Sequence, residues 1–404
     1  MKISRRNILK AGLGLSVALL DSTQLLNVLA KPQANKTKNV LLVIQLLGGN
    51  DGLNTIIPYG DGKYYDLRPR IGIRQNEVIQ INNQIGFHPS LEKFAKLYQD
   101  KQLAIIQGVG YPNPNLSHFR SLEIWQTAYP NSIASTGWLG RYIDETASDD
   151  NLFPGINLDL ALPKSLSANK IIVPSIANFP DFKFNVDSHF QNDEQSQIQA
   201  FKSIYKNFRT KNSDLNLIKH TGIGALESTF KIPDMVANYK ILTTYPNNEF
   251  ANKLKYIACL IANNCESSIY NLSLSGFDTH ANQAYQQANL LKNLSDSLYA
   301  FHQDLEAHKV SDNVMTLIFS EFGRRPSQND GQGTDHGTSQ PVLIIGSKIK
   351  GNLYGQYPSL SSLDSGNLKH DLDFRSIYAT ILDKWLNADS QAVLGRNYEI
   401  LPFV

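Results

Sequence analysis

The hydrophobic positions of this chain gather into five continuous apolar runs, most of which are bounded by glycine or polar residues. The runs cover 39–49, 102–110, 267–276, 313–323 and 340–347. Uninterrupted apolar runs of this length are typical of strands that are buried on both faces of a sheet. We therefore expect these five segments to form the centre of one sheet.

Stretches with a helical pattern lie around and between these runs. They predict helices over 90–100, 116–128, 193–210, 225–245, 249–263, 283–308 and 373–386. Strands that alternate with helices indicate an α/β fold with a mostly parallel sheet sandwiched by helices. The stretch 150–245 is more polar, and we interpret it as an insertion or cap within a single domain of residues 31–404 rather than as a second domain.

The N-terminus reads as a targeting segment. It begins MKISRRNILKAGLGLSVALL, with Arg5 and Arg6 ahead of an apolar stretch that is too short and too rich in glycine to anchor in a bilayer. Val28 and Ala30 have the spacing of a cleavage site. The segment resembles the bacterial twin-arginine export signal. We expect residues 1–30 to be a signal peptide read by the twin-arginine machinery and the mature protein to be periplasmic or secreted, with no stable membrane span. An amphipathic N-terminal helix is the alternative.

The net charge and the cysteine content of the chain bear on its possible partners and on disulfide formation. The 404 residues carry a formal net charge of +2, so no bulk charge favours nucleic acid or an anionic membrane surface. The two cysteines, Cys259 and Cys265, lie six residues apart near the end of a predicted helix. An exported protein could join them, but the helix would have to break between them, and two buried thiols are the simpler expectation.

Polar side chains that could carry chemistry cluster at one end of the apolar runs. In an open parallel sheet, ligands bind outside the carboxyl ends of the strands. The residues that follow the first four runs, or precede the fifth, are Asn50, Asp51, Ser117, His118, Arg120, Asp278, His280, Glu321, Arg324, Arg325, Asp335 and His336.

Each of these residues also has a simpler explanation. Asp51 after Gly-Gly could be a turn or capping residue, and Ser117 could be the N-cap of the helix that follows it. Asp278 and His280 could be a satisfied loop pair, and the two arginines a solvated turn. Together these residues indicate a functional site more strongly than any one of them does, because the predicted sheet brings all of them to one edge.

Five motifs within this set together carry a resemblance. They are LLGGNDGLNT, NPNLSHFRS, SGFDTHANQ, SEFGRRPSQN and GTDHGTSQPVLIIG. In these motifs and in their order, the chain resembles a bacterial, twin-arginine-exported, sulfatase-like family with a domain of unknown function, within the alkaline phosphatase and sulfatase superfamily. The resemblance runs along nearly the whole chain. It implies an alkaline-phosphatase-like α/β fold and a site for metal-assisted phosphoryl or sulfuryl transfer.

The resemblance also implies roles for individual residues. Ser117 matches the nucleophile at a helix start, and Arg120 or Arg324 would bind ester oxygens, as Arg325 could. The implied metal ligands are Asp51, Asp278, His280, Glu321, Asp335 and His336, of which Asp335 could instead orient His336.

The chain departs from the superfamily pattern at three points. Asp278 and His280 are two positions apart, where relatives usually have four. Phe322 stands where many relatives carry a histidine, so one imidazole is missing and the site could hold one ion or two. The segment SHFRS lacks the proline of the sulfatase motif, which argues against a formylglycine sulfatase.

Elementary chemistry agrees with a metal site. Phosphate and sulfate esters are shielded by anionic oxygens, and a divalent cation neutralises that charge. Carboxylates with imidazoles suit Zn²⁺, Mn²⁺ or Mg²⁺. The P-loop and G-x-S-x-G motifs are missing from the sequence. We therefore expect an exported metal-dependent hydrolase of phosphate or sulfate esters. The alternatives are an inert relative with a structural or binding role, and a metal-independent serine esterase.

Overall fold

The computed structural model describes residues 38–147, 151, 153–179 and 194–404. Its main feature is a mixed sheet whose strands follow the order β12-β5-β11-β8-β1-β7-β6, with β13 also paired to β5. The strands are β1 (Val40–Leu47), β5 (Leu103–Gly110), β6 (Gly155–Asn157), β7 (Ile269–Ser275), β8 (Val314–Ser320), β11 (Gln340–Ile345), β12 (Leu353–Tyr354) and β13 (Leu372–Asp373). The five predicted strands are its centre.

The sheet is mostly parallel. β1 pairs in parallel with both β7 and β8, and β6 pairs in parallel with β7. β11 is the exception, because it runs antiparallel to both β5 and β8. The carboxyl ends of β1, β5, β7 and β8 therefore share one edge of the sheet with the amino end of β11. The predicted α/β fold with a mostly parallel, helix-covered sheet is confirmed.

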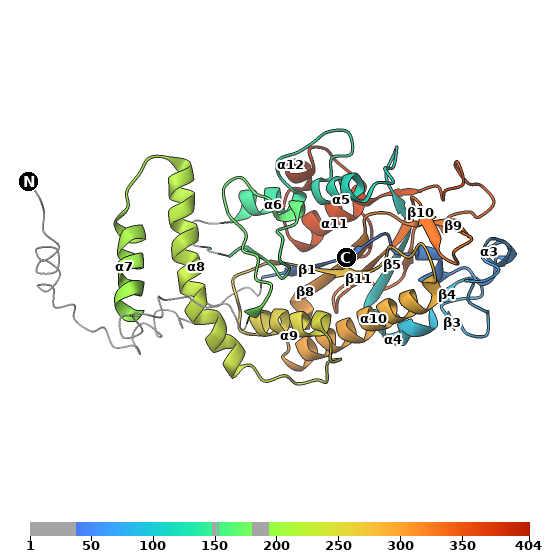
Figure 1. Ribbon diagram of the computed structural model, residues 1–404, viewed down its shortest axis with the longest axis horizontal. Coiled ribbons are helices and arrows are strands. Elements are labelled where there is room, and N and C mark those ends of the chain that lie inside the picture. The colour runs from blue at the N-terminus through green and yellow to red at the C-terminus, as the bar shows by residue number, and fades with distance from the viewer. Residues whose placement is uncertain (1–37, 148–150, 152, 180–193) are drawn as a thin grey trace, which may run out of the picture. The chain divides into compact units, whose positions relative to one another are not determined.

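Helices cover both faces of the sheet (Figure 1). On one face lie α4 (Glu92–Gln99), α9 (Glu249–Ala262) and α10 (Gln283–Ala307). On the other lie α5 (His118–Thr127), α6 (Trp138–Thr146), α11 (Phe374–Thr380) and α12 (Ser390–Leu394). Alternate side chains of β1 divide between the two layers, since Leu42 and Ile44 join the α9–α10 core whereas Leu41 and Val43 join the α5–α11 core. This alternation explains why the strand reads as a continuous apolar run.

Smaller elements complete the chain. Helix α3 (Gly62–Leu67) lies near a three-stranded sheet of β2 (Ile56–Ile57), β4 (Gly86–Phe87) and β3 (Ile79–Gln80). The glycine-rich segment after β8, read from the sequence as a loop, contains a hairpin of β9 (Arg324–Gln328) and β10 (Thr334–His336). Backbone pairing therefore holds Arg324 opposite His336.

The described part of the polar stretch between 150 and 245 contains one strand of the main sheet and two α-helices. Residues 155–157 form the edge strand β6 of the main sheet and so are integral to it. Further along are α7 (Glu194–Asn207) and α8 (Ser213–Asn238). Helix α8 begins earlier than predicted, because the Asn212 side chain caps it, and ends earlier, because the segment beyond it turns toward Asp304. An insertion or cap in this region stays a prediction.

Three other expectations concern the periphery. The predicted signal peptide, residues 1–30, lies outside the described residues. Within the described part of the chain, every helix is too short or too polar to cross a membrane. Cys259 and Cys265 are both free thiols there.

Candidate metal centre

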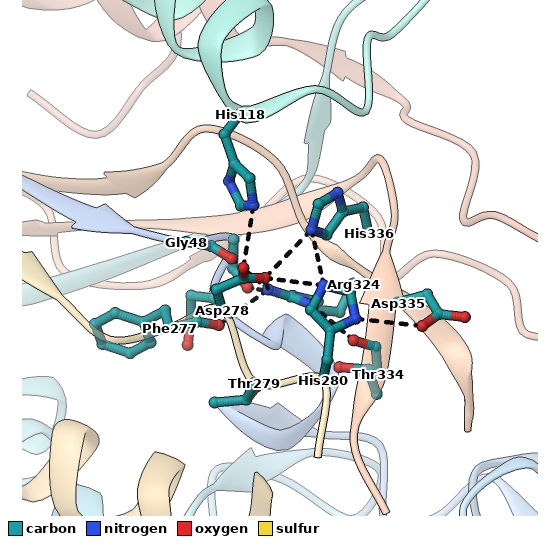
Figure 2. Close-up of polar contacts among 12 residues, drawn as sticks. Gly48, His118, Phe277, Asp278, Thr279, His280, Arg324, Thr334, Asp335 and His336 are labelled. Carbon is teal, nitrogen blue, oxygen red and sulfur yellow. Dashed lines mark hydrogen bonds and ion pairs between the residues drawn. The ribbon is translucent and has the colours of Figure 1, made fainter. Parts of the chain in front are cut away.

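Asp278 lies at the centre of a cluster of imidazoles at the carboxyl edge of the sheet. Its Oδ1 atom is 3.0 Å from Nε2 of His280 and 3.2 Å from Nε2 of His336. Its Oδ2 atom is 3.4 Å from Nε2 of His118. Figure 2 shows the three rings directed toward this carboxylate from α5, the loop after β7 and the β9–β10 hairpin. We call these four residues the Asp278 cluster.

The three imidazoles share one orientation. The Nδ1 atom of His118 is 2.8 Å from Oε1 of Glu321, and that of His336 is 2.8 Å from the carbonyl oxygen of Leu116. The Nδ1 atom of His280 is 3.4 Å from Oδ1 of Asp335. An oxygen acceptor therefore faces each Nδ1, and each Nε2 faces the carboxylate of Asp278. This is the usual arrangement of metal-binding histidines.

The potential ligand atoms of the Asp278 cluster lie close enough together to bind one cation. Nε2 of His280 lies 3.0 Å from Nε2 of His336, so two potential ligand nitrogens meet at one point. Nε2 of His118 is buried and has no hydrogen-bond partner among the described residues. Ligand atoms about 2.1 Å from a tetrahedral Zn²⁺ would be about 3.4 Å apart, close to the distances of the three Nε2 atoms from the Asp278 oxygens. His118, Asp278 and His336 offer ligand atoms that all lie within 4.8 Å of one another.

Burial and charge act against each other on Asp278. Partial burial would raise its pKa, but the hydrogen bond from Arg324, the charge of that guanidinium, and His336 and His280 together lower the pKa to about 2. A hydrogen bond from Asn329 is the main cause that lowers the pKa of Asp335, opposed by burial and assisted by His280. Both carboxylates are therefore anionic near neutral pH.

Arg324 is a buried clamp on this edge of the sheet. Its side chain is fully buried and donates to Oδ1 of Asp278 at 2.6 Å and to the carbonyl oxygen of Thr334 at 2.6 Å. It also donates to the carbonyls of Gly48, Gly49 and Phe277. These acceptors occupy the guanidinium, so the arrangement shows Arg324 binding protein rather than facing an ester.

The Gly-Gly pair after β1 serves this clamp. Gly48 and Gly49 have φ angles of +119° and +79°, which other residues rarely adopt. A Cβ atom on Gly49 would lie 2.2 Å from the ring of Phe322 and 3.3 Å from Nε of Arg324. The pair therefore lets two carbonyls approach the guanidinium.

Asp51 is held away from the Asp278 cluster. Its Oδ2 atom forms a fully buried ion pair of 2.6 Å with Arg68 and also accepts from Gln283. Its Oδ1 atom accepts the backbone N–H groups of Leu53 and Asn54, which makes it the N-cap of the short helical turn that follows. The structure thus shows Asp51 in its capping role, with an added buried arginine.

The other predicted residues lie in three different settings. Glu321 is buried and accepts from both His118 and the backbone N–H of Gly48, so it supports a ring of the cluster. Arg120 donates to Glu123, Pro130 and Ser132, which ties its guanidinium to the end of α5. Arg325 is partly exposed, beside Gly366.

Ser117 lies at the start of α5, between two residues that reach the cluster. The carbonyl of Leu116 anchors His336, and the ring of His118 faces Asp278. Within the described residues, the Ser117 side chain makes no capping hydrogen bond, although it occupies the N-cap position and is exposed. Its hydroxyl is therefore uncommitted at the rim of the cluster.

His118 is the member of the cluster that the predicted ligand set left out. The sequence motif points to the neighbouring Ser117 as a nucleophile, and the histidine stands there only among the strand-end residues. Phe322, where the resemblance implied a missing imidazole, packs its ring 4.9 Å from that of His118 and 4.7 Å from that of His336. The third imidazole therefore comes from the start of α5. Its signal was its place in the motif SHF, at the start of the helix that follows a buried strand.

Comparison with known proteins gives a family without an activity. The sequence profile described as "Protein of unknown function (DUF1501)" matches residues 37–399. No curated protein matches the chain.

Among solved structures, similarity extends over most of the chain at low identity. An alkaline phosphatase superfamily protein from Vibrio parahaemolyticus is 10% identical, covers 94% of this chain and 76% of its own, and has a TM-score of 0.37. A sulfatase from Pseudoalteromonas sp. is 12% identical, with 93% and 70% covered and a TM-score of 0.35. A Bacteroides thetaiotaomicron protein, from work on the metabolism of glycosaminoglycans, is 11% identical, with 91% and 83% covered and a TM-score of 0.39. At these scores, a similarity says nothing about chemistry.

Proposed function

The chain belongs to the DUF1501 family of proteins of unknown function, and we propose that it is a metal-dependent hydrolase of phosphate or sulfate esters. One observation carries the proposal. Three imidazoles keep their Nδ1 atoms on oxygen acceptors and direct their Nε2 atoms toward Asp278. It brings the Nε2 atoms of His280 and His336 within 3.0 Å of each other, next to the carboxylate of Asp278.

The nitrogen and oxygen atoms of the Asp278 cluster indicate which divalent metals would bind there. His118, His280 and His336 would hold the ion together with Asp278, and three nitrogens with one oxygen suit Zn²⁺ or Mn²⁺ better than Mg²⁺ or Ca²⁺. A divalent ion held here would neutralise ester oxygens and lower the pKa of a bound hydroxyl or water. Glu321, Asp335 and the Leu116 carbonyl would orient the three rings.

Ser117 is the candidate nucleophile. Its hydroxyl lies beside His118 at the N-terminus of a ten-residue helix, where the helix dipole favours an anionic group. Attack by its Oγ on the phosphorus or sulfur centre would form a covalent ester with the serine and release the leaving alcohol. Water would then cleave that ester and restore the hydroxyl. Because Arg120 and Arg324 are both engaged with protein groups, neither is proposed as an ester clamp.

Two measurements test the proposal. Protein purified without chelators is analysed for metal, and the same sample is assayed with aryl phosphate and aryl sulfate esters with added Zn²⁺ or Mn²⁺. We expect bound metal and turnover that a chelator abolishes and the ion restores. In Asp278→Asn, which keeps the shape of the side chain, we expect both to be lost.

The same measurements separate the alternatives. Metal without turnover of either ester class would favour the inert, structural or binding role. Turnover that survives complete removal of metal would favour a serine esterase. Absence of metal binding in a folded protein would refute the proposal itself.

We further propose export by the twin-arginine route to the periplasm or the exterior. The proposal rests on Arg5 and Arg6 ahead of a short apolar stretch. Changing both to lysine keeps the charge and should abolish export. Delivery of the double variant at the level of the unchanged chain would contradict this route.

A further inference from the structure

Two arginine side chains near the carboxyl edge of the sheet are buried and already paired with carboxylates. Arg324 binds Asp278 at 2.6 Å and Arg68 binds Asp51 at 2.6 Å, and the side chains of both arginines are fully buried. A buried cation next to an anion supplies the positive charge that a metal ion would otherwise bring. We propose that the centre binds one divalent ion, and that Arg324 and Arg68 stand as fixed cations in place of a second. This inference rests on the proposed function.

Arg324 occupies part of the space around Asp278. Nη2 of Arg324 lies against Oδ1, and Nη1 of the same guanidinium is 3.5 Å from Nε2 of His280. A second ion bridging Oδ1 would therefore meet a guanidinium that five other protein oxygens and ring atoms hold in place. His280 and His336 approach the same oxygen, Oδ1, at 3.0 and 3.2 Å, and His118 approaches Oδ2 at 3.4 Å, so the three rings and the guanidinium together leave room for one ion.

Asp51 is unavailable as a ligand for a second ion. Both of its oxygens already accept hydrogen bonds, from Arg68 and Gln283 on one side and from two backbone N–H groups on the other. Its side chain is fully buried. A metal ion at Asp51 would have to displace a buried guanidinium, leaving Arg68 with only carbonyl and amide oxygens around its charge.

The side-chain charges at this edge of the sheet also agree with a single divalent ion. The edge holds four carboxylates, Asp51, Asp278, Glu321 and Asp335, and two buried guanidiniums. The four carboxylates and two guanidiniums alone leave two negative charges, which one divalent cation neutralises. Arg325 adds little, since it is partly exposed and water screens it.

The test counts ions. Full-length protein stripped with a chelator is titrated with Zn²⁺ and with Mn²⁺, and bound metal per chain is measured after desalting. We expect one ion per chain, and for Mn²⁺ the electron paramagnetic resonance spectrum of an isolated ion. Two ions per chain, or the spectrum of a spin-coupled pair, would overturn this inference and leave the proposed function standing. Absence of binding by folded protein would overturn both.

Two matched variants locate the ion. Asp51→Asn and Asp278→Asn make the same change, one at each paired carboxylate, and circular dichroism shows which variants fold. We expect Asp51→Asn to keep one ion per chain and Asp278→Asn to lose at least 100-fold in affinity. A folded Asp51→Asn protein that binds no metal would contradict the assignment of Asp51 to Arg68. Should Asp51→Asn fail to fold, the ion count of the unchanged protein decides.

Discussion

Glu321 and His118 are 203 positions apart in the sequence, yet Oε1 of the glutamate lies 2.8 Å from Nδ1 of the histidine. The glutamate comes from the end of β8 and the histidine from the first turn of α5. Glu321 is almost fully buried and also accepts from the Gly48 backbone, so its carboxylate cannot move to follow the ring. The pair therefore fixes which nitrogen of His118 faces Asp278.

The first prediction removes this support. In Glu321→Ala, His118 loses the acceptor that orients its ring, and we expect metal affinity to fall by about 10- to 100-fold. Glu321→Gln is the matched control, because an amide oxygen can still accept from Nδ1, and it should lose much less. Competition with a coloured chelator measures both affinities. Equal affinity in the alanine variant and the unchanged protein would show that the pair has no role in metal binding.

The second prediction concerns stability. A ligand that binds only the folded state stabilises it, by about 2.7 kcal/mol when present at 100 times its dissociation constant. We expect Zn²⁺ or Mn²⁺ at that excess to raise the unfolding temperature of the apo protein. His336→Ala should show no such increase, because it removes a ligand atom 3.2 Å from Asp278. An equal rise in this variant would place the ion elsewhere.

The third prediction concerns the buried pair of Arg68 and Asp51. Removing one partner of a buried ion pair leaves an unpaired charge, so Arg68→Ala should lower the free energy of unfolding by about 3–5 kcal/mol. The exposed pair of Lys292 and Asp296 is the control, and Lys292→Ala should cost about 1 kcal/mol or less. Urea unfolding measures both. Similar losses in the two variants would contradict a structural role for Arg68.

Much of this fold was predictable because the five central strands are buried on both faces. Such strands leave unbroken apolar runs, and the polar residues at their ends then mark the functional edge. The antiparallel direction of β11 carries no comparable signal, although it is what brings Asp335 and His336 to that edge.

The partners of individual site residues were not predictable. Nothing near Arg68 in the sequence indicates that it pairs with Asp51, since the contact depends on how α3 packs beside the hairpin strand β9. Arg324 was predicted to bind ester oxygens, but its acceptors are the Asp278 carboxylate and backbone carbonyls from separate loops. Such contacts are set by tertiary packing, which a single sequence does not reveal.

The fourth prediction concerns pH. Burial lowers the pKa of His88 from 6.5 to about 4, opposed by the charges of Asp51 and Glu77. Below pH 6.5 the His88 side chain therefore binds a proton in the unfolded chain but not in the folded protein. Its contribution to the free energy of unfolding is complete above pH 6.5 and is lost as the pH falls toward 4. The full loss is about 3 kcal/mol. Urea unfolding between pH 7 and 4 should show a weaker pH dependence for His88→Asn than for the unchanged protein, and identical slopes would contradict this.

The last prediction separates a nucleophile from a helix cap at Ser117. Its side chain makes no capping bond among the described residues, whereas Asn248 caps α9 by accepting the backbone N–H of Ala251 at 2.8 Å. Asn248→Ala should therefore cost about 1 kcal/mol of stability, and Ser117→Ala only a few tenths.

The two variants should differ in the opposite way in their turnover, with the larger loss in Ser117→Ala. With an aryl ester that the unchanged protein hydrolyses, Ser117→Ala should lose activity by orders of magnitude while its metal content stays the same, because the hydroxyl that carries the transferred group is gone. Asn248→Ala should keep its activity. Near-normal turnover in Ser117→Ala would rule out covalent catalysis by this serine and leave attack by water at the Asp278 cluster as the route to hydrolysis.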